Sequence, residues 1–465
     1  MAEGSSYGEE LLKVEPHGVE PIAVGERHGR PSNVFSLWVG ANVEFATLTT
    51  GALAVGLFGL GFGQAALALV LGTLLGALLL GALTTFGPRL GVPQLIQSRG
   101  AFGFVGNYVP AFLNFLSGVG WFAINTVLGV YALEWLLHWS FIPALLLMAI
   151  VQILFAVYGY NVIHAFERYM AVALTLLFAV VTVYALPRIH FLAAASTSAP
   201  LWSGLSGSFI LAFGVAVSYV LGWVPFASDY TRYLPADTKP HRTFWSAYWG
   251  VALSCIWLEV LGAGLATIKG ISVPSDLVTN FLPPAVAALT MVAVVLGTVT
   301  ANVLNIYSGS LSALAIDTSV VRAIFPRRWV AVLVVGVLGT VLSLLGRQGY
   351  YGTYENFLLL LAYWVAPWAA IAAVDYFLLR RGRYTTADLY DRRRTVGVGL
   401  LAWLLGVAAS VPFFNQALYL GPIAKAHPGL GDISYYVSFV VAGVVYYLAA
   451  RATAPATVAG HSSSR

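Results

Sequence analysis

The chain consists largely of apolar runs separated by short polar segments, and this pattern limits its fold more than any other feature. A helix of about 20 residues crosses the hydrocarbon core of a bilayer, and several of these runs reach that length. Only 9% of the 465 residues are charged, whereas a soluble globular protein has about 25%. The sequence therefore predicts an all-α integral membrane protein and excludes a soluble one.

We predict twelve transmembrane spans from these runs. They lie near residues 34–58, 64–87, 108–136, 141–160, 167–186, 207–226, 244–268, 285–314, 329–346, 354–379, 396–414 and 433–451. The first 33 residues are polar and acidic and lack a basic stretch followed by an apolar one, so we expect a tail there rather than a signal peptide. The single cysteine, Cys255, excludes an internal disulfide.

Basic residues predict which side of the membrane each loop faces, because cytoplasmic loops have an excess of Lys and Arg. With the N-terminus inside, fifteen of the 24 Lys and Arg fall in cytoplasmic loops and four in outer loops. A span missed early in the chain would erase this difference, so the even number of spans and two cytoplasmic termini support each other. Membrane insertion thus explains the net charge of +5, and we expect no nucleic-acid partner.

The first and sixth spans contain residues that interrupt a transmembrane helix. The first reads WVGANVEFATLTTGAL, with Asn42 and Glu44, and the sixth reads LGWVPFASD, with Gly222, Pro225 and Asp229. Broken helices at corresponding positions in two halves of a chain indicate the binding site of a secondary transporter. The alternative for the sixth span is a plain helix end at the proline, with Asp229 in solvent.

Other polar residues mark helix faces that avoid lipid. A charged residue inside a span costs about 2.5–3.5 kcal/mol on insertion scales, so Glu44 should face a cavity or a partner, or stay protonated. Trp121 and Asn125 share one face of the third span, whereas Glu259 in the seventh span has no evident partner. A polar and small stripe in the eighth span consists of Thr298, Asn302, Asn305, Gly309 and Ser312. Such faces line a cavity or pack against neighbouring helices.

These residues give the chain a resemblance to the nucleobase–cation symporter family, and within it to the purine–cytosine permease group. The matching segments are WVGANVEF, SRGAFGFVGNYVPAFLNFLSGVGWF, GWVPFASDYTRYLP, TANVLNIYSGSL and DYFLLRRGRY. They extend over most of the chain, and the second, third and fifth are the specific ones.

The resemblance implies twelve transmembrane helices, with spans 1–5 and 6–10 forming a five-plus-five inverted repeat, spans 1 and 6 broken, and two extra helices. It implies alternating access, in which spans 1, 2, 6 and 7 rock against spans 3, 4, 8 and 9. We accordingly expect a cytoplasmic N-terminal tail (1–33), an inverted-repeat transport core (34–379), a cytoplasmic basic loop with spans 11 and 12 (380–451) and a cytoplasmic C-terminal tail (452–465).

The resemblance also implies a site for a flat heterocycle midway across the membrane. Trp121 and Trp223 match the two aromatic residues that stack on the ring. Asn125 and Asn302 match the amides that bind its edge, and the backbone around Gly222 adds hydrogen bonds. The polar position in span one corresponds to either Glu44 or Asn42.

Cation coupling is a further implication, and the ion is either H+ or Na+. Sodium-coupled relatives use span-one carbonyls, here at Gly40 and Val43, together with oxygens early in span eight. The residues five and six positions before Asn302 have no hydroxyl, and Thr298 supplies one only in a shifted register. Glu44 is a titratable group able to carry a proton, so the sequence favours protons slightly.

The predicted function is a secondary active transporter in the plasma membrane that imports a nucleobase, such as cytosine or a purine, together with a cation and without a cofactor. The alternative is hydantoin, allantoin or a vitamin-like heterocycle on the same scaffold. An integral-membrane enzyme would need an acid–base pair or metal ligands at one depth, and the sequence suggests none. A channel would not need two broken helices at repeat-related positions.

Overall fold

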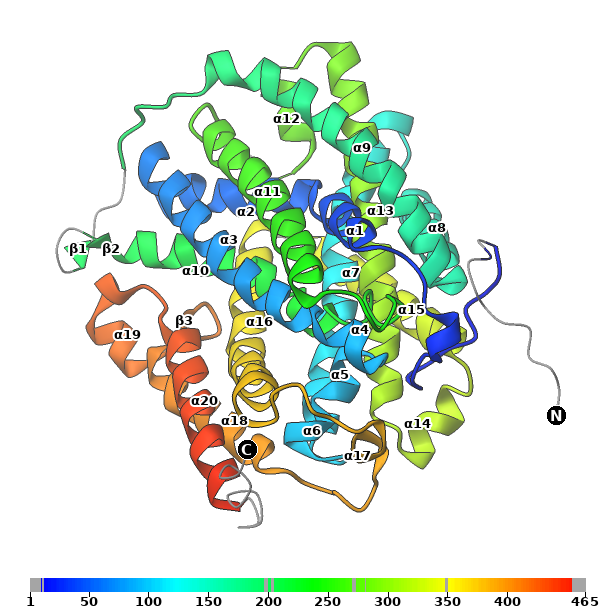
Figure 1. Cartoon of the computed structure of the whole chain (residues 1–465). Coiled ribbons are helices and arrows are strands. Elements are labelled where there is room, and N and C mark those ends of the chain that lie inside the picture. The colour runs from blue at the N-terminus through cyan, green and yellow to red at the C-terminus, as the bar shows by residue number, and fades with distance from the viewer. Residues whose placement is uncertain are drawn as a thin grey trace.

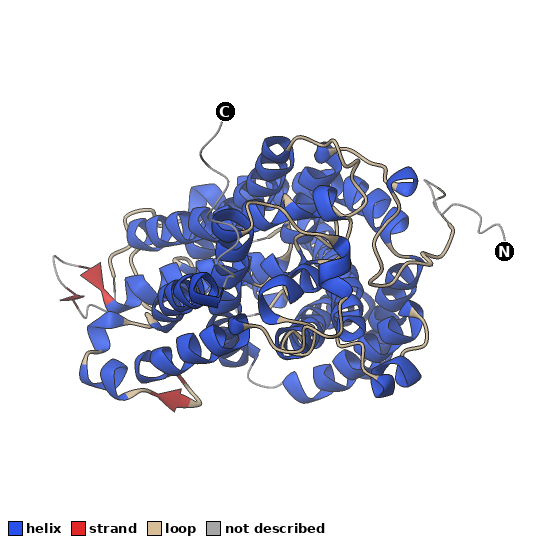
Figure 2. Cartoon of the chain, turned by 60° about the horizontal axis from the view of Figure 1, so that its bottom comes forward, coloured by secondary structure: helices blue, strands red, loops and turns tan. Residues whose placement is uncertain are grey.

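Helices make up nearly all of the regular structure in the computed structural model of the chain (Figures 1 and 2). The structure describes residues 10, 12–195, 200–201, 205–269, 273–280, 282–347 and 350–453. Within these residues, ten helical stretches are long and apolar enough to cross a membrane. The first and eleventh predicted spans are shorter apolar helices, so each of the twelve predicted spans corresponds to helical structure.

The main helices follow the predicted order. They are α1 (Pro31–Asn42), α2 (Phe45–Gly56), α3 (Phe62–Thr84), α7 (Tyr108–Leu137), α8 (Phe141–Tyr158), α9 (Tyr160–Ala185), α10 (Gly207–Leu221), α11 (Pro240–Ala266), α13 (Pro284–Ala315), α15 (Arg328–Gly346), α16 (Tyr350–Ala373), α18 (Val398–Ser410) and α20 (Ser434–Thr453). A π-helical turn (Val374–Leu379) extends α16, and 3-10 turns lie at Val24–Glu26, Leu186–Arg188, Val224–Phe226, Val411–Phe413 and Pro428–Leu430.

Short elements occupy the connections. They are the helices α4 (Phe86–Leu90), α5 (Gln94–Gln97), α6 (Arg99–Phe102), α12 (Ser275–Asn280), α14 (Ser319–Ile324), α17 (Thr386–Tyr390) and α19 (Pro422–Ala426). Strand β1 (Pro200–Leu201) pairs antiparallel with β2 (Leu205–Ser206), with Pro200 opposite Ser206. Strand β3 (Asn415–Gln416) pairs antiparallel with β4 (Tyr419–Leu420), with Asn415 opposite Leu420.

The predicted interruption of the first span separates α1 from α2. The helix stops at Asn42 because Glu44 has extended backbone angles, with φ of −141° and ψ of 171°. α2 then restarts the same span at Phe45. The break leaves helix ends inside the protein, where their polar backbone groups are available to other ligands.

The sixth span breaks at Leu221, and the chain continues through turns as far as Leu234. Pro225 has no backbone N–H, so a regular helix cannot continue through it with all hydrogen bonds made. The alternative of a plain helix end with a solvated carboxylate is wrong, because Asp229 is 1% exposed. Its Oδ1 accepts a hydrogen bond of 2.9 Å from the backbone N–H of Gln94.

Small residues allow the core helices to approach closely. α7 packs along α13, and α2 packs along α11. A Cβ atom on Gly118 of α7 would lie 3.1 Å from the Cα atom of Gly309 of α13, and one on Gly51 of α2 would lie 1.8 Å from the carbonyl oxygen of Glu259 of α11. Close backbone contact of this kind stabilises helix pairs in membranes, where no hydrophobic effect drives them together. Part of the predicted stripe in span eight therefore packs against α7.

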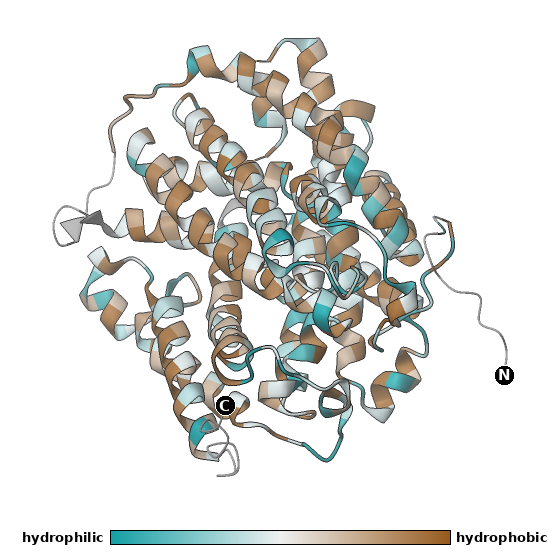
Figure 3. Ribbon diagram, viewed as in Figure 1, coloured by the Kyte–Doolittle hydropathy of each residue, from teal (hydrophilic) through white to brown (hydrophobic). Residues whose placement is uncertain are grey.

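The outer surface of the bundle is apolar. Four leucines of α3, Leu67, Leu71, Leu75 and Leu78, are each between 41% and 53% exposed, and their spacing places them along one helix face. Figure 3 shows hydrophobic residues along the helices, with hydrophilic residues concentrated in connecting segments. An apolar surface of this extent suits contact with lipid.

The fifth span differs most from its predicted bounds. The apolar pattern places its start at residue 167, but α9 begins at Tyr160. The first two turns of α9 contain polar residues, including His164 and Glu167, and these lowered the apparent hydropathy. His164 is 8% exposed and Glu167 is 0% exposed, so protein covers both side chains.

Residues 12–30, the N-terminal segment, cover the end of the bundle where α8 meets α9. The backbone N–H of Ile22 donates to the carbonyl of Gly91 at 2.9 Å. Glu15 is fully enclosed: its carboxylate lies 2.8 Å from the guanidinium of Arg232 and 3.9 Å from that of Arg328. This part of the predicted N-terminal tail therefore folds against the core and links elements on both sides of it.

Candidate functional site

The two helix breaks meet through a hydrogen bond. The indole N–H of Trp223 donates to Oδ1 of Asn42 at 2.9 Å. Nδ2 of Asn42 donates in turn to the carbonyl of Trp38 at 2.7 Å, and the ring of Trp38 lies edge-to-face on Trp223, with centroids 5.6 Å apart. Asn42 therefore connects the end of α1 to the turn after α10, and it fixes the position of the Trp223 indole.

Glu44 lies at the N-terminus of α2 and is 0% exposed. Its Oε1 accepts a hydrogen bond of 3.2 Å from the hydroxyl of Tyr219, which is itself 2.7 Å from the hydroxyl of Thr47. Oε2 of Glu44 has no hydrogen-bond partner among the described residues. The sequence left open whether Glu44 or Asn42 is the polar position of span one. In the structure Asn42 accepts the hydrogen bond from Trp223, whereas Glu44 has one carboxylate oxygen without a partner in the described part of the chain.

Trp121 of α7 lies against the second break. A Cβ atom on Gly222 would be 3.0 Å from Nε1 of Trp121, so any larger residue would crowd the indole at this close approach to the backbone. The Trp121 ring also packs edge-to-face on Tyr219 and Phe357, with centroids 5.6 and 5.2 Å away. Since Tyr219 also contacts Glu44, the predicted residues of spans one, three and six form one cluster.

The asparagines of this cluster differ in their hydrogen bonding. Nδ2 of Asn302 donates to the carbonyl of Phe122 at 3.0 Å, to Thr126 at 3.0 Å and to Gln152 at 3.1 Å. Asn302 thus faces α7 and α8 rather than an open site. Both polar atoms of Asn125, and Oδ1 of Asn305, are buried without a hydrogen-bond partner among the described residues. Asn125 and Asn305 are therefore the amides with free hydrogen-bonding capacity.

Thr298 was the threonine of α13 that the sequence offered as a cation ligand, but its hydroxyl does not reach the break in span one. The hydroxyl of Thr298 donates to Val295 of its own helix at 2.9 Å. It also lies 2.5 Å from the Cβ position of Gly129, on the side of α7. The hydroxyl of Thr300 instead lies 3.1 Å from the carbonyl oxygen of Gly40 and 2.6 Å from that of Gly297. Thr300, which the sequence reasoning did not single out, is the threonine that reaches the break in span one.

Val43 completes the oxygen-rich contact between α1 and α13. A Cβ atom on Gly297 would lie 3.3 Å from the carbonyl oxygen of Val43 and 3.1 Å from Cβ of Glu44. Gly297 thereby lets the broken end of α1 sit directly on α13. Gly40, Val43 and Glu44 thus adjoin α13 at the break in span one, whereas the Thr298 hydroxyl lies on the side of α7.

Comparison with known proteins identifies the class. A family model described as "Permease for cytosine/purines, uracil, thiamine, allantoin" matches residues 21–438. The chain belongs to this permease family. A Bacillus subtilis protein named "Putative purine-cytosine permease YxlA" is 32% identical to the permease, over 94% of this chain and 96% of that protein. The purine-cytosine permease fcyB of Emericella nidulans is 29% identical, over 94% of this chain and 88% of its own length.

The fold of the permease matches a solved transporter structure. Mhp1, a nucleobase-cation-symport-1 family transporter in a closed conformation with bromovinylhydantoin bound, superimposes with a TM-score of 0.76 at 20% sequence identity, over 94% of this chain and 95% of that one. This likeness confirms the predicted fold of twelve helices with a five-plus-five inverted repeat. The predicted family is confirmed as well, and the permease is a multi-pass membrane protein.

One buried carboxyl of the permease escaped the sequence reasoning. Glu167 of α9 has no hydrogen-bond partner for either carboxylate oxygen among the described residues. It lies against the end of α1, because a Cβ atom on Gly40 would be only 2.2 Å from its Oε2. Because polar residues precede Glu167 in the sequence, the predicted fifth span began at this residue, and Glu167 was not recognised as buried. The available signal was its spacing from His164, which puts both residues on one face of a helix.

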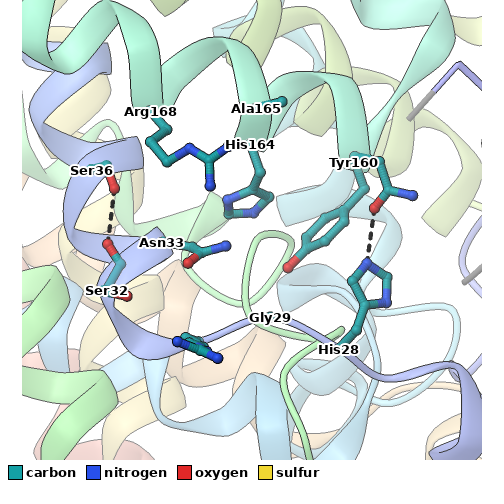
Figure 4. Close-up of a pocket in the computed structure, with 11 residues that line it drawn as sticks. His28, Gly29, Ser32, Asn33, Ser36, Tyr160, His164, Ala165 and Arg168 are labelled. Atoms are coloured by element: carbon teal, nitrogen blue, oxygen red, sulfur yellow. Dashed lines mark hydrogen bonds between the residues drawn. The ribbon is translucent and has the colours of Figure 1, made fainter. Parts of the chain in front are cut away.

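A cavity of the permease lies on another face of α9, lined by His164, Ala165 and Arg168 but not by Glu167. It has a volume of about 630 Å³ and lies between the N-terminal segment, α1 and α9. Figure 4 shows His164 and Arg168 of α9 opposite Asn33 and Ser36 of α1. The isolated carboxyl of span seven lies elsewhere: Glu259 accepts a short hydrogen bond from Thr73 of α3. That bond gives Glu259 the partner that the sequence did not reveal.

Proposed function

We propose that this permease is a secondary active transporter that uses a cation gradient to import a nucleobase, such as cytosine or a purine. The observation that carries the proposal is the meeting of two broken helices at the Trp223–Asn42 hydrogen bond, with the Trp121 indole against Gly222. Broken helices of this kind form the substrate and ion sites of secondary transporters.

The chemistry of the cluster suits a flat polar ring. The indoles of Trp121 and Trp223 offer aromatic faces for stacking. Amides that must hydrogen-bond a ring edge discriminate strongly against rings that lack the matching groups, because a buried amide would then stay unpaired. We assign this edge recognition to Asn125 and Asn305, and we assign Asn302 the task of holding α13 against α7 and α8.

A second class of substrate also fits the same scaffold. The family description includes thiamine and allantoin beside cytosine and purines, and the related Mhp1 structure contains a hydantoin. Allantoin, hydantoin or a vitamin-like heterocycle would use the same stacking and amide contacts. The substrate class therefore depends on the pattern of donors and acceptors along the ring edge, and competition between heterocycles reveals that pattern.

Uptake of labelled cytosine into cells that express the permease tests the proposed function. We expect saturable uptake that needs a cation gradient and that a subset of unlabelled nucleobases inhibits. Inhibition by hydantoin or allantoin alone would assign the second substrate class. Absence of uptake and of competition by any heterocycle, from protein shown to be in the membrane, would contradict transport of this class of compound.

We also propose the plasma membrane as the location, with both termini cytoplasmic. The excess of Lys and Arg in alternate loops supports this orientation. The N-terminal segment then covers the cytoplasmic end, and inward opening requires its contacts with Arg232 and Arg328 to separate. Alternating access would expose the substrate cluster first to the outside and then to the cytoplasm.

The coupling cation, H+ or Na+, is proposed to bind at the break in span one. Carbonyl oxygens at a broken helix end attract cations, and here Gly40 and Val43 supply them beside Thr300. We propose that Thr300 has the role that the sequence suggested for Thr298.

Thr300→Val should raise the cation concentration needed for half-maximal uptake by about 10- to 100-fold, because a hydrogen bond to a charged group contributes about 1.5–3 kcal/mol. Thr298→Val is the matched control, since it removes the same hydroxyl from the face of α13 toward α7. The measurement is uptake at a series of Na+ concentrations and pH values. Equal effects of the two substitutions would contradict the assignment of Thr300.

A further inference from the structure

We propose that Glu167 is a second carboxyl of the coupling-cation site, and that the transported monovalent cation balances the single negative charge that Glu167 and Glu44 carry when they share one proton. The inference rests on the proposed symport and names the residue that makes the site acidic on the side of α9. Neither the matching segments of the sequence nor the predicted cation residues include Glu167.

The geometry places both carboxyls beside one group of oxygens. The Glu167 carboxylate lies against Gly40, within 2.2 Å of where a Cβ atom would stand. The carbonyl oxygen of Gly40 is 3.1 Å from the Thr300 hydroxyl, which is 2.6 Å from the carbonyl oxygen of Gly297. A Cβ atom on Gly297 would in turn lie 3.1 Å from Cβ and 3.2 Å from Cα of Glu44. Two carboxyls, two carbonyls and one hydroxyl therefore adjoin the same break.

The unpaired state of Glu167 indicates a ligand. Both of its carboxylate oxygens are buried and without a hydrogen-bond partner among the described residues, and the side chain is 0% exposed. A buried carboxylate is costly unless it is paired, neutralised or bound to a cation. Ionisable residues within membrane spans are accordingly found on ion and proton pathways. A monovalent cation at this site would satisfy Glu167 and the free Oε2 of Glu44 together.

Glycine at position 40 is what admits the carboxyl. Any larger side chain there would occupy the space that Oε2 of Glu167 fills. The absence of a side chain thus exposes the α1 backbone to the carboxylate just before the helix ends. A structural carboxyl could have been satisfied by a hydroxyl, as Thr73 satisfies Glu259. Glu167 instead faces backbone that carries a cation-binding carbonyl.

The surroundings of Glu167 contain other titratable and charged groups. His164 precedes it by one turn on α9, and the ring of Tyr230 lies 6.4 Å from that of His164. Arg168 follows Glu167 in sequence, but its guanidinium lies over the Tyr169 ring, 5.3 Å from the centroid, and not on the carboxylate. Glu44 faces the same site from α2. A cation would thus be the counter-charge that the neighbouring side chains do not supply.

The cavity beside α9 lies near the proposed site. His164 and Arg168 line it (Figure 4), and His164 stands one helical turn from Glu167. The cavity opens beside the N-terminal segment, which the proposed topology places in the cytoplasm.

Binding measurements on purified full-length permease test the role of Glu167. The probe is labelled cytosine, or the purine or hydantoin that competes best in uptake, titrated with Na+ at fixed pH and with pH in the absence of Na+. Whichever titration, with Na+ or with pH, raises the affinity of the wild-type protein for the heterocycle identifies the coupling cation. Coupled sites typically change each other's affinity by about 5- to 150-fold, and we expect Glu167→Gln to reduce this gain to about twofold or less while cation-independent binding persists.

A matched control variant separates a specific role of Glu167 from a general effect of removing a buried carboxyl. Glu259→Gln removes an equally buried carboxyl from α11 and should keep the wild-type gain; a loss there as well would overturn the specific role of Glu167. If the cation increased the heterocycle affinity of Glu167→Gln as much as that of the wild type, the inference would be wrong, but the proposed transport function would be unaffected. Wild-type permease that binds none of the heterocycles would overturn the proposed function itself, and the inference with it.

Glu167→Asp decides the question if the glutamine variant does not fold. This substitution keeps the charge and withdraws it by one methylene from Gly40. We expect the cation concentration for half-maximal effect to rise at least about fivefold while maximal heterocycle binding stays the same. An unchanged cation dependence in a folded Glu167→Asp protein would overturn the inference.

Discussion

Trp223→Ala is expected to lower heterocycle affinity by about 30-fold or more and to abolish uptake at low substrate concentration. The substitution removes an aromatic stacking surface, which contributes about 1–3 kcal/mol per base in proteins that stack nucleobases. It also leaves Oδ1 of Asn42 without the indole N–H that now lies 2.9 Å away, and an unsatisfied buried acceptor costs about 1–3 kcal/mol. The measurement is equilibrium binding of labelled cytosine, or of the best competitor, to purified protein.

Two further variants separate the contributions at this position. Trp223→Phe keeps an aromatic face and loses the N–H donor, so its affinity should lie between those of the wild type and Trp223→Ala. Trp245→Ala removes a tryptophan of α11 that is 49% exposed and should leave binding unchanged. If Trp223→Ala retained wild-type affinity in a folded protein, Trp223 would not contact the substrate and the stacking arrangement would be wrong.

Glu15→Ala is expected to destabilise the permease by about 3–5 kcal/mol, because removing one partner of a buried ion pair leaves the other charge uncompensated. The side chains of Glu15 and Arg232 are both 0% exposed, and Oε1 of Glu15 lies 2.8 Å from Nη2 of Arg232. The Glu15 carboxylate also accepts hydrogen bonds from the hydroxyls of Tyr233, at 2.6 Å, and Tyr307, at 2.9 Å. Thermal and denaturant unfolding of the purified protein measures the loss.

The pH dependence of this contact has a defined sign. Burial would raise the pKa of the Glu15 carboxyl, but Arg328, Arg232 and the hydrogen bonds from Tyr233 and Tyr160 together lower it below its usual value of 4.5. A carboxyl with a lower pKa in the folded state stabilises the fold above its unfolded pKa. This contribution is lost as pH falls through the folded pKa. The stability of Glu15→Ala should therefore vary less with pH below 4.5 than that of the wild type.

A surface glutamate in the same part of the chain provides the control. Glu10 lies 3.8 Å from Lys13, with its side chain 68% exposed, and exposed ion pairs contribute about 0–1 kcal/mol. Glu10→Ala should thus have little effect. The double variant Glu15→Ala with Arg232→Ala should lose less stability than the sum of the single variants, because the uncompensated charge is gone. A loss below about 1 kcal/mol for Glu15→Ala would show that the pair does not hold the N-terminal segment.

The predicted spans and the two breaks required only local information. A span must satisfy its backbone hydrogen bonds within one helix and present apolar side chains to lipid, so its pattern is legible in the sequence itself. The same rule makes Pro225, and the polar run around Glu44, visible as interruptions. The start of α9 was misplaced most, because its first two turns are polar and lie within protein.

The partners within the site could not be read from the sequence. Thr298 and Thr300 lie about 200° apart around α13, and which of them meets Gly40 depends on how α1 packs against α13. Likewise, Asn302 and Asn305 share a stripe, but only the contacts with α7 and α8 show that Asn302 is fully engaged.

The sequence by itself determined the membrane location, the number of spans and the two points where helices break, because each of these follows from residues close together in the chain. The tertiary structure alone decided which side chains meet at the breaks. Glu167 reaches Gly40 from another helix, and Glu15 reaches Arg232 from 217 residues away. Such contacts depend on the rotation and approach of whole helices, and the apolar pattern of one helix does not specify its neighbour.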